Sequence, residues 1–283
     1  MYVFYDFETT GINPAFDQPT QFAAILTDEK FNEIEAVNWR CQLSHHILPS
    51  PKALNVTKTT VDQLIDKSLP TLFEMARKIQ NLIVKWTPAI WIGYNSINFD
   101  ELILRQIFYQ NLQPNVYATQ INGNSRSDLL TLMYAVHGFY PLEFSWPRND
   151  SGSHTFKLDR LAPENGYLKH DAHDALGDVR ATIFLAKRLK YKCPPIWKHA
   201  IRCSSKHNLN SLLMSGDPLL LVIRTGSGSP TVRNIAFVGR STDDQNKVAV
   251  LDLDILMELN VKLDNIGDSN IFDLLKKDRR LIK

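Results

Sequence analysis

The N-terminal segment YVFYDFETT, residues 2–10, has the apolar composition of a buried β-strand but carries Asp6 and Glu8. Successive side chains of a strand point to opposite faces, so Asp6 and Glu8 share one face while Tyr5 and Phe7 share the other. Two neighbouring carboxylates repel each other unless a cation or hydrogen-bond donors compensate. A solvated strand end shows the same pattern, so the pair alone allows either a surface feature or a divalent-metal site.

Alternating strand and helix patterns predict a mixed α/β unit over residues 1–192 of the 283-residue chain. A hairpin-like turn joins the second and third strands, and Ser68 is the expected N-cap of the second helix. The expected strands are residues 2–10, 21–28, 35–42 and 87–95, and the expected helices are residues 60–66, 70–86, 99–111, 127–137, 155–162 and 174–190.

Residues 193–283 form a second, β-rich unit in this interpretation, preceded by a basic stretch. Seven Lys or Arg and no acid lie between Lys187 and Lys206, which indicates either a solvated face or a phosphate-contacting surface. The expected elements are strands within residues 218–230, 234–240 and 247–254 and a helix at 271–277.

Composition excludes several classes of protein. No apolar run approaches the roughly 18 residues of a membrane span, and the start of the chain lacks a secretory signal pattern. The three cysteines, Cys41, Cys193 and Cys203, show no CxxC clustering, which argues against a disulfide framework or a zinc site. We therefore expect a cytoplasmic protein without a membrane span.

Further acids occur at the starts of two predicted helices. Asp100 follows the strand WIGYN, and His173 and Asp178 lie in HDAHDALGDVR. Each has a plain structural interpretation, because acids favour helix N-termini and a histidine at a helix entrance often only makes a hydrogen bond. Together with Asp6 and Glu8, however, Asp100, His173 and Asp178 form an ordered set of acids and one histidine along the chain.

DFETTG, NSINFD and HDAxxD resemble the three motifs of the DEDDh exonucleases, which have a ribonuclease H-like fold. The segments NPAFDQPTQFAAILTD, IGYNSINFDELILRQIFY, NSRSDLLTLM, SWPRND and TFKLDRLAPENG are similar to the bacterial exodeoxyribonuclease I family through nearly all of residues 1–190. The resemblance implies a 3′→5′ exonuclease that releases mononucleotides from single-stranded DNA. The alternatives are an oligoribonuclease-like exoribonuclease and an inactive nucleic-acid-binding module.

By this resemblance Asp6, Glu8, Asp100 and Asp178 are the catalytic metal ligands and His173 is the general base. Carboxylates from separate segments suit a pair of Mg²⁺ ions, for which Mn²⁺ can substitute. An imidazole suits proton removal near neutral pH.

Substrate contacts are expected near these motifs, where charge and aromatic faces can hold a single strand. Lys157 stands where the family carries an arginine, and Phe156 either packs near a base or belongs to the core. Backbone N–H groups of residues 9–11 are expected to approach the terminal nucleotide. The full set of expected substrate-binding residues is Glu8, Arg105, Arg126, Phe156 and Lys157.

The resemblance also implies partners and a longer relative. Single-stranded DNA and the single-stranded-DNA-binding protein are the implied partners, and the expected state is a monomer. Family members continue into further domains, so residues 193–283 are expected to contain a truncated SH3-like domain. Such a chain is expected to keep catalysis and to dissociate from a long strand more often.

Overall fold

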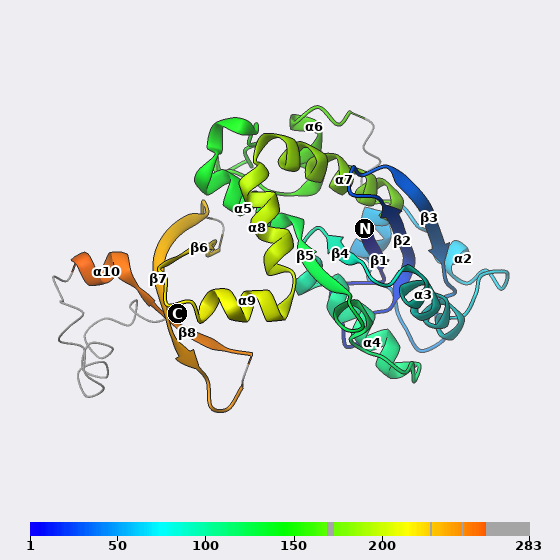
Figure 1. Ribbon diagram of the computed structural model, residues 1–283. Helices are drawn as coiled ribbons and strands as arrows, with labels where there is room; N and C mark the ends of the chain where they lie inside the picture. Colours follow the sequence, from blue (N-terminus) through cyan, green and yellow to red (C-terminus); the bar gives the residue numbers. More distant parts are fainter. Residues whose placement is uncertain (169–172, 227, 245, 259–283) are drawn as a thin grey trace.

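The computed structural model describes residues 1–168, 173–226, 228–244 and 246–258. Its strands form two sheets, a five-stranded one in the order β3-β2-β1-β4-β5 and a three-stranded one in the order β6-β7-β8 (Figure 1). The strands are β1 (Tyr2–Thr9), β2 (Pro19–Thr27), β3 (Glu33–Arg40), β4 (Ile90–Gly93), β5 (Ser125–Asp128), β6 (Leu219–Ile223), β7 (Thr231–Arg240) and β8 (Val248–Asp252).

Helices cover both faces of the larger sheet, and further helices lead to the smaller one (Figure 1). The α-helices are α1 (Pro51–Thr57), α2 (Val61–Leu64), α3 (Leu72–Trp86), α4 (Asp100–Gln110), α5 (Leu129–Phe139), α6 (Leu158–Glu164), α7 (Ala175–Lys192), α8 (Pro194–Cys203), α9 (Lys206–Leu213) and α10 (Leu253–Glu258), and short 3₁₀ turns are η1 (Ser96–Asn98), η2 (Ala118–Gln120) and η3 (Pro141–Glu143).

Strand β1 lies in the middle of the sheet, antiparallel to β2 and parallel to β4. Its side chains alternate between two cores. Tyr2 and Phe4 pack in the core formed with α7, whereas Val3, Tyr5 and Phe7 pack in the core formed with α3 and α4. This alternation determines that later residues of even number on β1 face the α7 side.

The mixed sheet flanked by helices confirms the predicted fold class, and the three-stranded antiparallel sheet confirms a small β-rich unit. Helix α3 begins one turn later than expected. Its N-cap is Thr71, not Ser68, because Thr71 and Glu74 form a reciprocal capping box. The helix predicted at 271–277 lies outside the described residues.

Helices α1, α8, α9 and α10 and strand β5 were missed. Strand β5 has no apolar alternation and is defined by its pairing with β4. Helix α8 begins at Pro194, and the proline pair was interpreted as a boundary although proline is well tolerated in a first helical turn.

Helix α8 is built into the core of the larger sheet. Its Trp197 is buried, with its ring 5.4 Å from that of Tyr2 and 5.3 Å from that of Phe31. The predicted division between residues 192 and 193 stays a prediction. Among the described residues, none of the helices is long and apolar enough to cross a membrane.

The buried carboxylate of Glu101 ties three segments to α4. It accepts hydrogen bonds from the hydroxyl of Tyr5 (2.9 Å), from Thr119 Oγ1 (2.9 Å) and from Arg126 Nη1 (3.2 Å). Arg105 Nη2 lies 3.6 Å from the same carboxylate. Strand β1, the η2 turn and strand β5 are therefore all bound to one charge at the start of α4.

We predict that Glu101→Ala lowers the free energy of unfolding by about 2–4 kcal/mol, because two buried hydroxyls and an arginine lose their acceptor. Urea unfolding followed by circular dichroism measures the change. Lys85→Gln is the control, since the pair of Lys85 with Glu35 lies at the surface and contributes far less. Equal losses in the two variants would contradict the prediction.

Candidate active site

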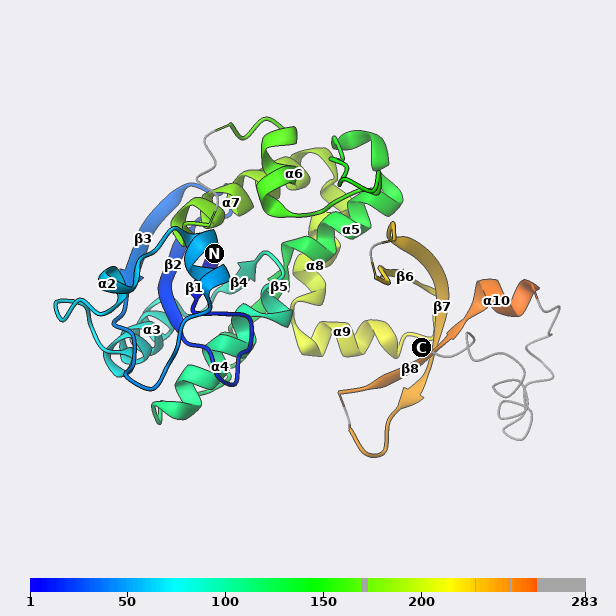
Figure 2. The ribbon, with the colours of Figure 1, turned by 180° about the vertical axis from the view of Figure 1, so that it is seen from behind.

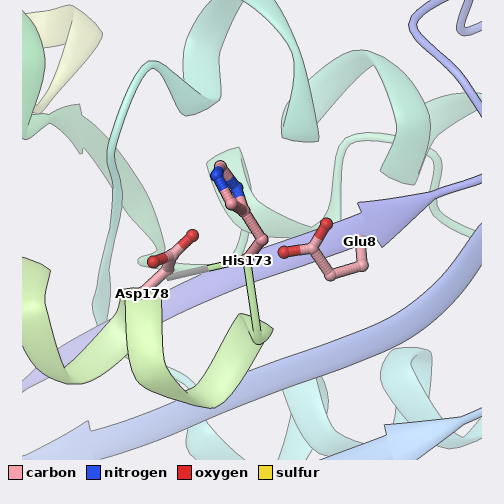
Figure 3. Close-up of side chains that lie close together, drawn as sticks. All are labelled: Glu8, His173 and Asp178. Carbon is pink, nitrogen blue, oxygen red and sulfur yellow. The ribbon is translucent and has the colours of Figure 1, made fainter. Parts of the chain in front are cut away.

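Asp6 and Glu8 extend from the face of β1 that carries Tyr2 and Phe4 and thus point towards α7. Asp178 lies in the first turn of α7, and His173 immediately precedes the N-cap of that helix. In Figure 3 the imidazole stands between the carboxylates of Glu8 and Asp178, and ligand atoms of these residues all lie within 4.8 Å of one another.

Asp100 comes to the same place from the other side of the sheet. It is the first residue of α4 and is only 3% exposed. Its Oδ1 accepts the backbone N–H of Phe7 at 3.0 Å. Because Phe7 lies between Asp6 and Glu8, this bond fixes the start of α4 against the acidic part of β1.

The loop before α4 is held by a residue that the sequence did not single out, Asp128. This buried carboxylate accepts the backbone N–H groups of Asn95 (2.9 Å), Ile97 (3.1 Å) and Leu130 (3.0 Å). Asp128 ends β5 and caps α5, so it joins the ends of two parallel strands. The sequence pattern that could have identified Asp128 as an N-cap is an acid directly before the apolar helical segment LLTLM.

Gln21, a second residue that the sequence did not single out, positions the start of α7. Asp174 caps the helix by accepting the N–H of Gly177 at 3.1 Å, and Gln21 Nε2 of β2 donates to Asp174 at 2.7 Å. Gln21 is the polar residue in the otherwise apolar QFAAILT, which was the available signal. His173 adopts φ 66°, a left-handed conformation that costs a non-glycine residue about 1–2 kcal/mol. The neighbouring cap therefore holds His173 in a strained orientation.

Burial and mutual repulsion govern the protonation of the acids. Burial, followed by repulsion from Asp100 and Asp178, raises the pKa of Asp6 well above its ordinary value. Burial and repulsion from Asp178 and Asp100 raise the pKa of Glu8 to about 8. Burial raises the pKa of Asp100 to about 8, although the N–H of Phe7 opposes the change.

The chemistry of this donor set fits divalent cations. In the part of the chain that the structure describes, neither Lys nor Arg forms an ion pair with Asp6, Glu8 or Asp100. Crowded carboxylate oxygens are the ligands that Mg²⁺ and Mn²⁺ prefer.

The expected substrate residues have different surroundings. Lys157 is exposed and lines a groove of about 600 Å³ together with His173 and Asp178. Phe156 is only 2% exposed, which favours the core alternative over contact with a base. Arg105 and Arg126 bind Glu101, and their contact with phosphate stays a prediction.

Two other groups considered as substrate contacts, the backbone N–H groups of residues 9–11 and the basic stretch, already have some partners within the protein. The backbone N–H of Thr10 donates to the carbonyl of Gln18 at 2.9 Å and is thus occupied within the protein. In the basic stretch, Lys192 pairs with Glu143 at 3.0 Å and Lys190 donates to the carbonyl of Glu29 at 2.5 Å. These contacts favour a structural role for that part of the stretch.

A family model described as Exonuclease (RNase_T) matches residues 3–186. The chain belongs to this exonuclease family. Within it, the chain is 33% identical to Exodeoxyribonuclease I of Buchnera aphidicola subsp. Schizaphis graminum over 284 aligned residues, which cover 96% of this chain and 58% of that protein. It is 34% identical to Exodeoxyribonuclease I of Escherichia coli K12, covering 95% and 56%. The chain thus spans somewhat over half the length of these relatives.

Solved structures of E. coli Exonuclease I have a similar fold. A complex with a dA16 oligonucleotide gives a TM-score of 0.79 at 32% identity, covering 94% of this chain and 60% of that one. A zinc-bound form of the complex with single-stranded DNA gives 0.79 at 33% identity, covering 89% and 54%. An ExoI/SSB-Ct complex gives 0.78 at 33% identity, covering 89% and 55%.

The raised pKa values of Glu8 and Asp100 predict that the metal-free protein loses stability as the pH rises from about 4 to about 8. In this range the folded state holds protons that the unfolded state has released, so stabilisation present at low pH disappears above the folded-state pKa. The expected slope is up to about 1.4 kcal/mol per pH unit for each such proton.

Urea unfolding in EDTA at several pH values measures this slope. Asp100→Asn removes one charge of the cluster and should flatten it, and saturating Mg²⁺ should do the same in the unmodified protein. A stability that stays constant or rises with pH in EDTA would contradict the prediction.

Proposed function

We propose that the chain is a metal-dependent 3′→5′ exonuclease that degrades single-stranded DNA to 5′-mononucleotides. The observation that carries the proposal is the convergence of Glu8 and Asp178 on His173, beside the buried Asp100 and the half-buried Asp6. The similarity to exodeoxyribonuclease I supports this substrate and direction. An inactive binding module would have no need for such a mutually repelling acid set.

In the proposed mechanism Asp6, Glu8, Asp100 and Asp178 hold two Mg²⁺ ions, with Mn²⁺ as a substitute. Bound divalent ions supply Lewis-acid stabilisation of the charge that develops on phosphate oxygens. A ring nitrogen of His173 accepts the proton of the attacking water as its oxygen bonds to phosphorus and the bond to the 3′-oxygen of the penultimate nucleotide breaks. The released product carries the 5′-phosphate.

The groove beside His173 and Asp178 is the proposed path of the strand. Lys157 lies on its edge and is the proposed phosphate contact near the reacting group. A lysine offers a compact charge without the forked geometry of an arginine, so it constrains the orientation of the phosphate less.

Asp178→Asn is expected to lose metal-dependent cleavage while keeping its fold, because the amide removes a charged ligand and relieves repulsion. A 5′-labelled DNA strand and a matched RNA strand, incubated with Mg²⁺ or EDTA and resolved on a gel, provide the test. Asp217→Asn, an exposed site in the second unit, is the matched control. Cleavage by Asp178→Asn at the unmodified rate would refute the assignment, and faster shortening of RNA would favour an exoribonuclease.

His173→Asn is expected to reduce the cleavage rate by roughly 10²- to 10⁴-fold, the usual contribution of a positioned base. Asparagine tolerates the left-handed conformation, so the variant removes the imidazole without adding backbone strain. The rate is measured from pH 5 to pH 9 at saturating Mg²⁺. A variant that keeps the unmodified pH–rate profile would exclude His173 as the base.

Single-stranded DNA is the proposed partner, and the C-terminal peptide of the single-stranded-DNA-binding protein is proposed as a second. Support for the latter comes from the ExoI/SSB-Ct complex of a relative. A monomeric state, location in the cytoplasm and reduced processivity remain predictions from the sequence.

A further inference from the structure

The groove that contains His173 and Asp178 is not built by the larger sheet alone. Arg224, which follows β6 of the three-stranded sheet, lines the same groove of about 600 Å³ as Lys157. Strand β6 lies beside α5 in both views (Figures 1 and 2). A cation from the second unit therefore faces the proposed path of the substrate.

The guanidinium of Arg224 is held in place by two aromatic rings. Its central carbon lies 4.8 Å from the ring centre of Phe156 and 5.3 Å from that of Tyr134. Nη1 donates to the hydroxyl of Tyr134 at 3.2 Å, and Nε donates to the carbonyl of Gly228 at 2.8 Å. Stacking on aromatic faces orients a guanidinium and reduces the entropy that it loses when it binds an anion.

Toward the part of the chain that the structure describes, the guanidinium of Arg224 uses less than half of its hydrogen-bonding capacity. An arginine has five N–H donors, and the contacts with Tyr134 and Gly228 use two of them. Among the described residues, neither Asp nor Glu forms an ion pair with Arg224. By contrast, Arg105 and Arg126 both bind Glu101. Arg224 thus retains both the charge and the donors that a phosphate requires.

The position of Arg224 is fixed by direct packing between the two units. Tyr134 and Gly138 are one turn apart on α5, so they share a face of that helix. At Gly138 a Cβ would lie 2.7 Å from Val232 Cγ2 of β7. The missing side chain lets β7 approach α5 closely, and Arg224 lies over the rings of Tyr134 and Phe156 on the same side.

We infer that Arg224 is a phosphate-binding residue of the substrate groove. This inference rests on the proposed function. Arg224 binds a backbone phosphate through its free N–H groups, and Lys157 binds another. The competing role is purely structural: Arg224 would act as a strut, a side chain that only joins the two units through its contacts with Phe156 and Tyr134.

The test measures binding separately from hydrolysis. Anisotropy of a 5′-fluorescein-labelled dT12 strand is titrated in EDTA at several NaCl concentrations for the unmodified chain, Arg224→Gln, Arg224→Lys and Lys247→Gln. Lys247 is the matched control, because it is an exposed cation of the second unit that pairs with Asp244 and does not line the groove.

Arg224→Gln is expected to weaken binding by about 3- to 10-fold, the effect of losing one charge-assisted contact. It should also reduce the slope of log affinity against log salt by about 0.7, the value for one phosphate contact on a single strand. Arg224→Lys should keep the slope and regain part of the affinity, and Lys247→Gln should match the unmodified chain.

Two results would overturn the inference. One is a lower melting temperature of Arg224→Gln with unchanged affinity and salt slope, which is the behaviour of a strut. The other is absence of salt-dependent binding by the unmodified chain. Failure of the unmodified chain to cleave in Mg²⁺ would instead reject the proposed function. The binding titrations in EDTA would still show whether Arg224 contacts the DNA.

Discussion

Mutual repulsion among Asp6, Glu8, Asp100 and Asp178 is the constraint around which the larger unit is organised. Like charges at one strand end would separate if their backbones were free to move. Two hydrogen bonds hold them together: the N–H of Phe7 donates to Asp100, and Gln21 donates to Asp174, the N-cap of α7. The fold therefore stores electrostatic free energy that bound cations can release, which couples occupancy of the site to stability.

Some residues that the sequence suggested as substrate contacts also stabilise the fold. Arg126 and Arg105 were expected to meet phosphate, yet both bind the buried carboxylate of Glu101 next to the acidic site. Phe156 was left open between base contact and core, and its face is covered by Arg224. An arginine near an active site can thus serve a protein carboxylate, as Arg105 and Arg126 do, and not only a substrate phosphate.

The sequence predicted the sheet because it depends on local patterns, whereas Asp100, His173 and Asp178 were assigned through the family resemblance and their catalytic roles stay predictions. Alternation along YVFYDFETT put Asp6 and Glu8 on one face, and that face is the one covered by α7. Strand β5 was missed because SRSD acquires its structure only by pairing with β4. The roles of Asp128, Gln21 and Arg224 were missed for a similar reason. Each acts through contacts between segments far apart in the chain, which periodicity does not reveal.

Helix α8 gives the connection between the two sheets an unusual property. Connectors between domains are commonly exposed, but Trp197 of α8 is buried in the first core, where its ring packs edge-on against both Tyr2 and Phe31. Because leaving the larger sheet would expose the Trp197 ring to water, α8 stays packed on the first core and is not a free tether between the two sheets.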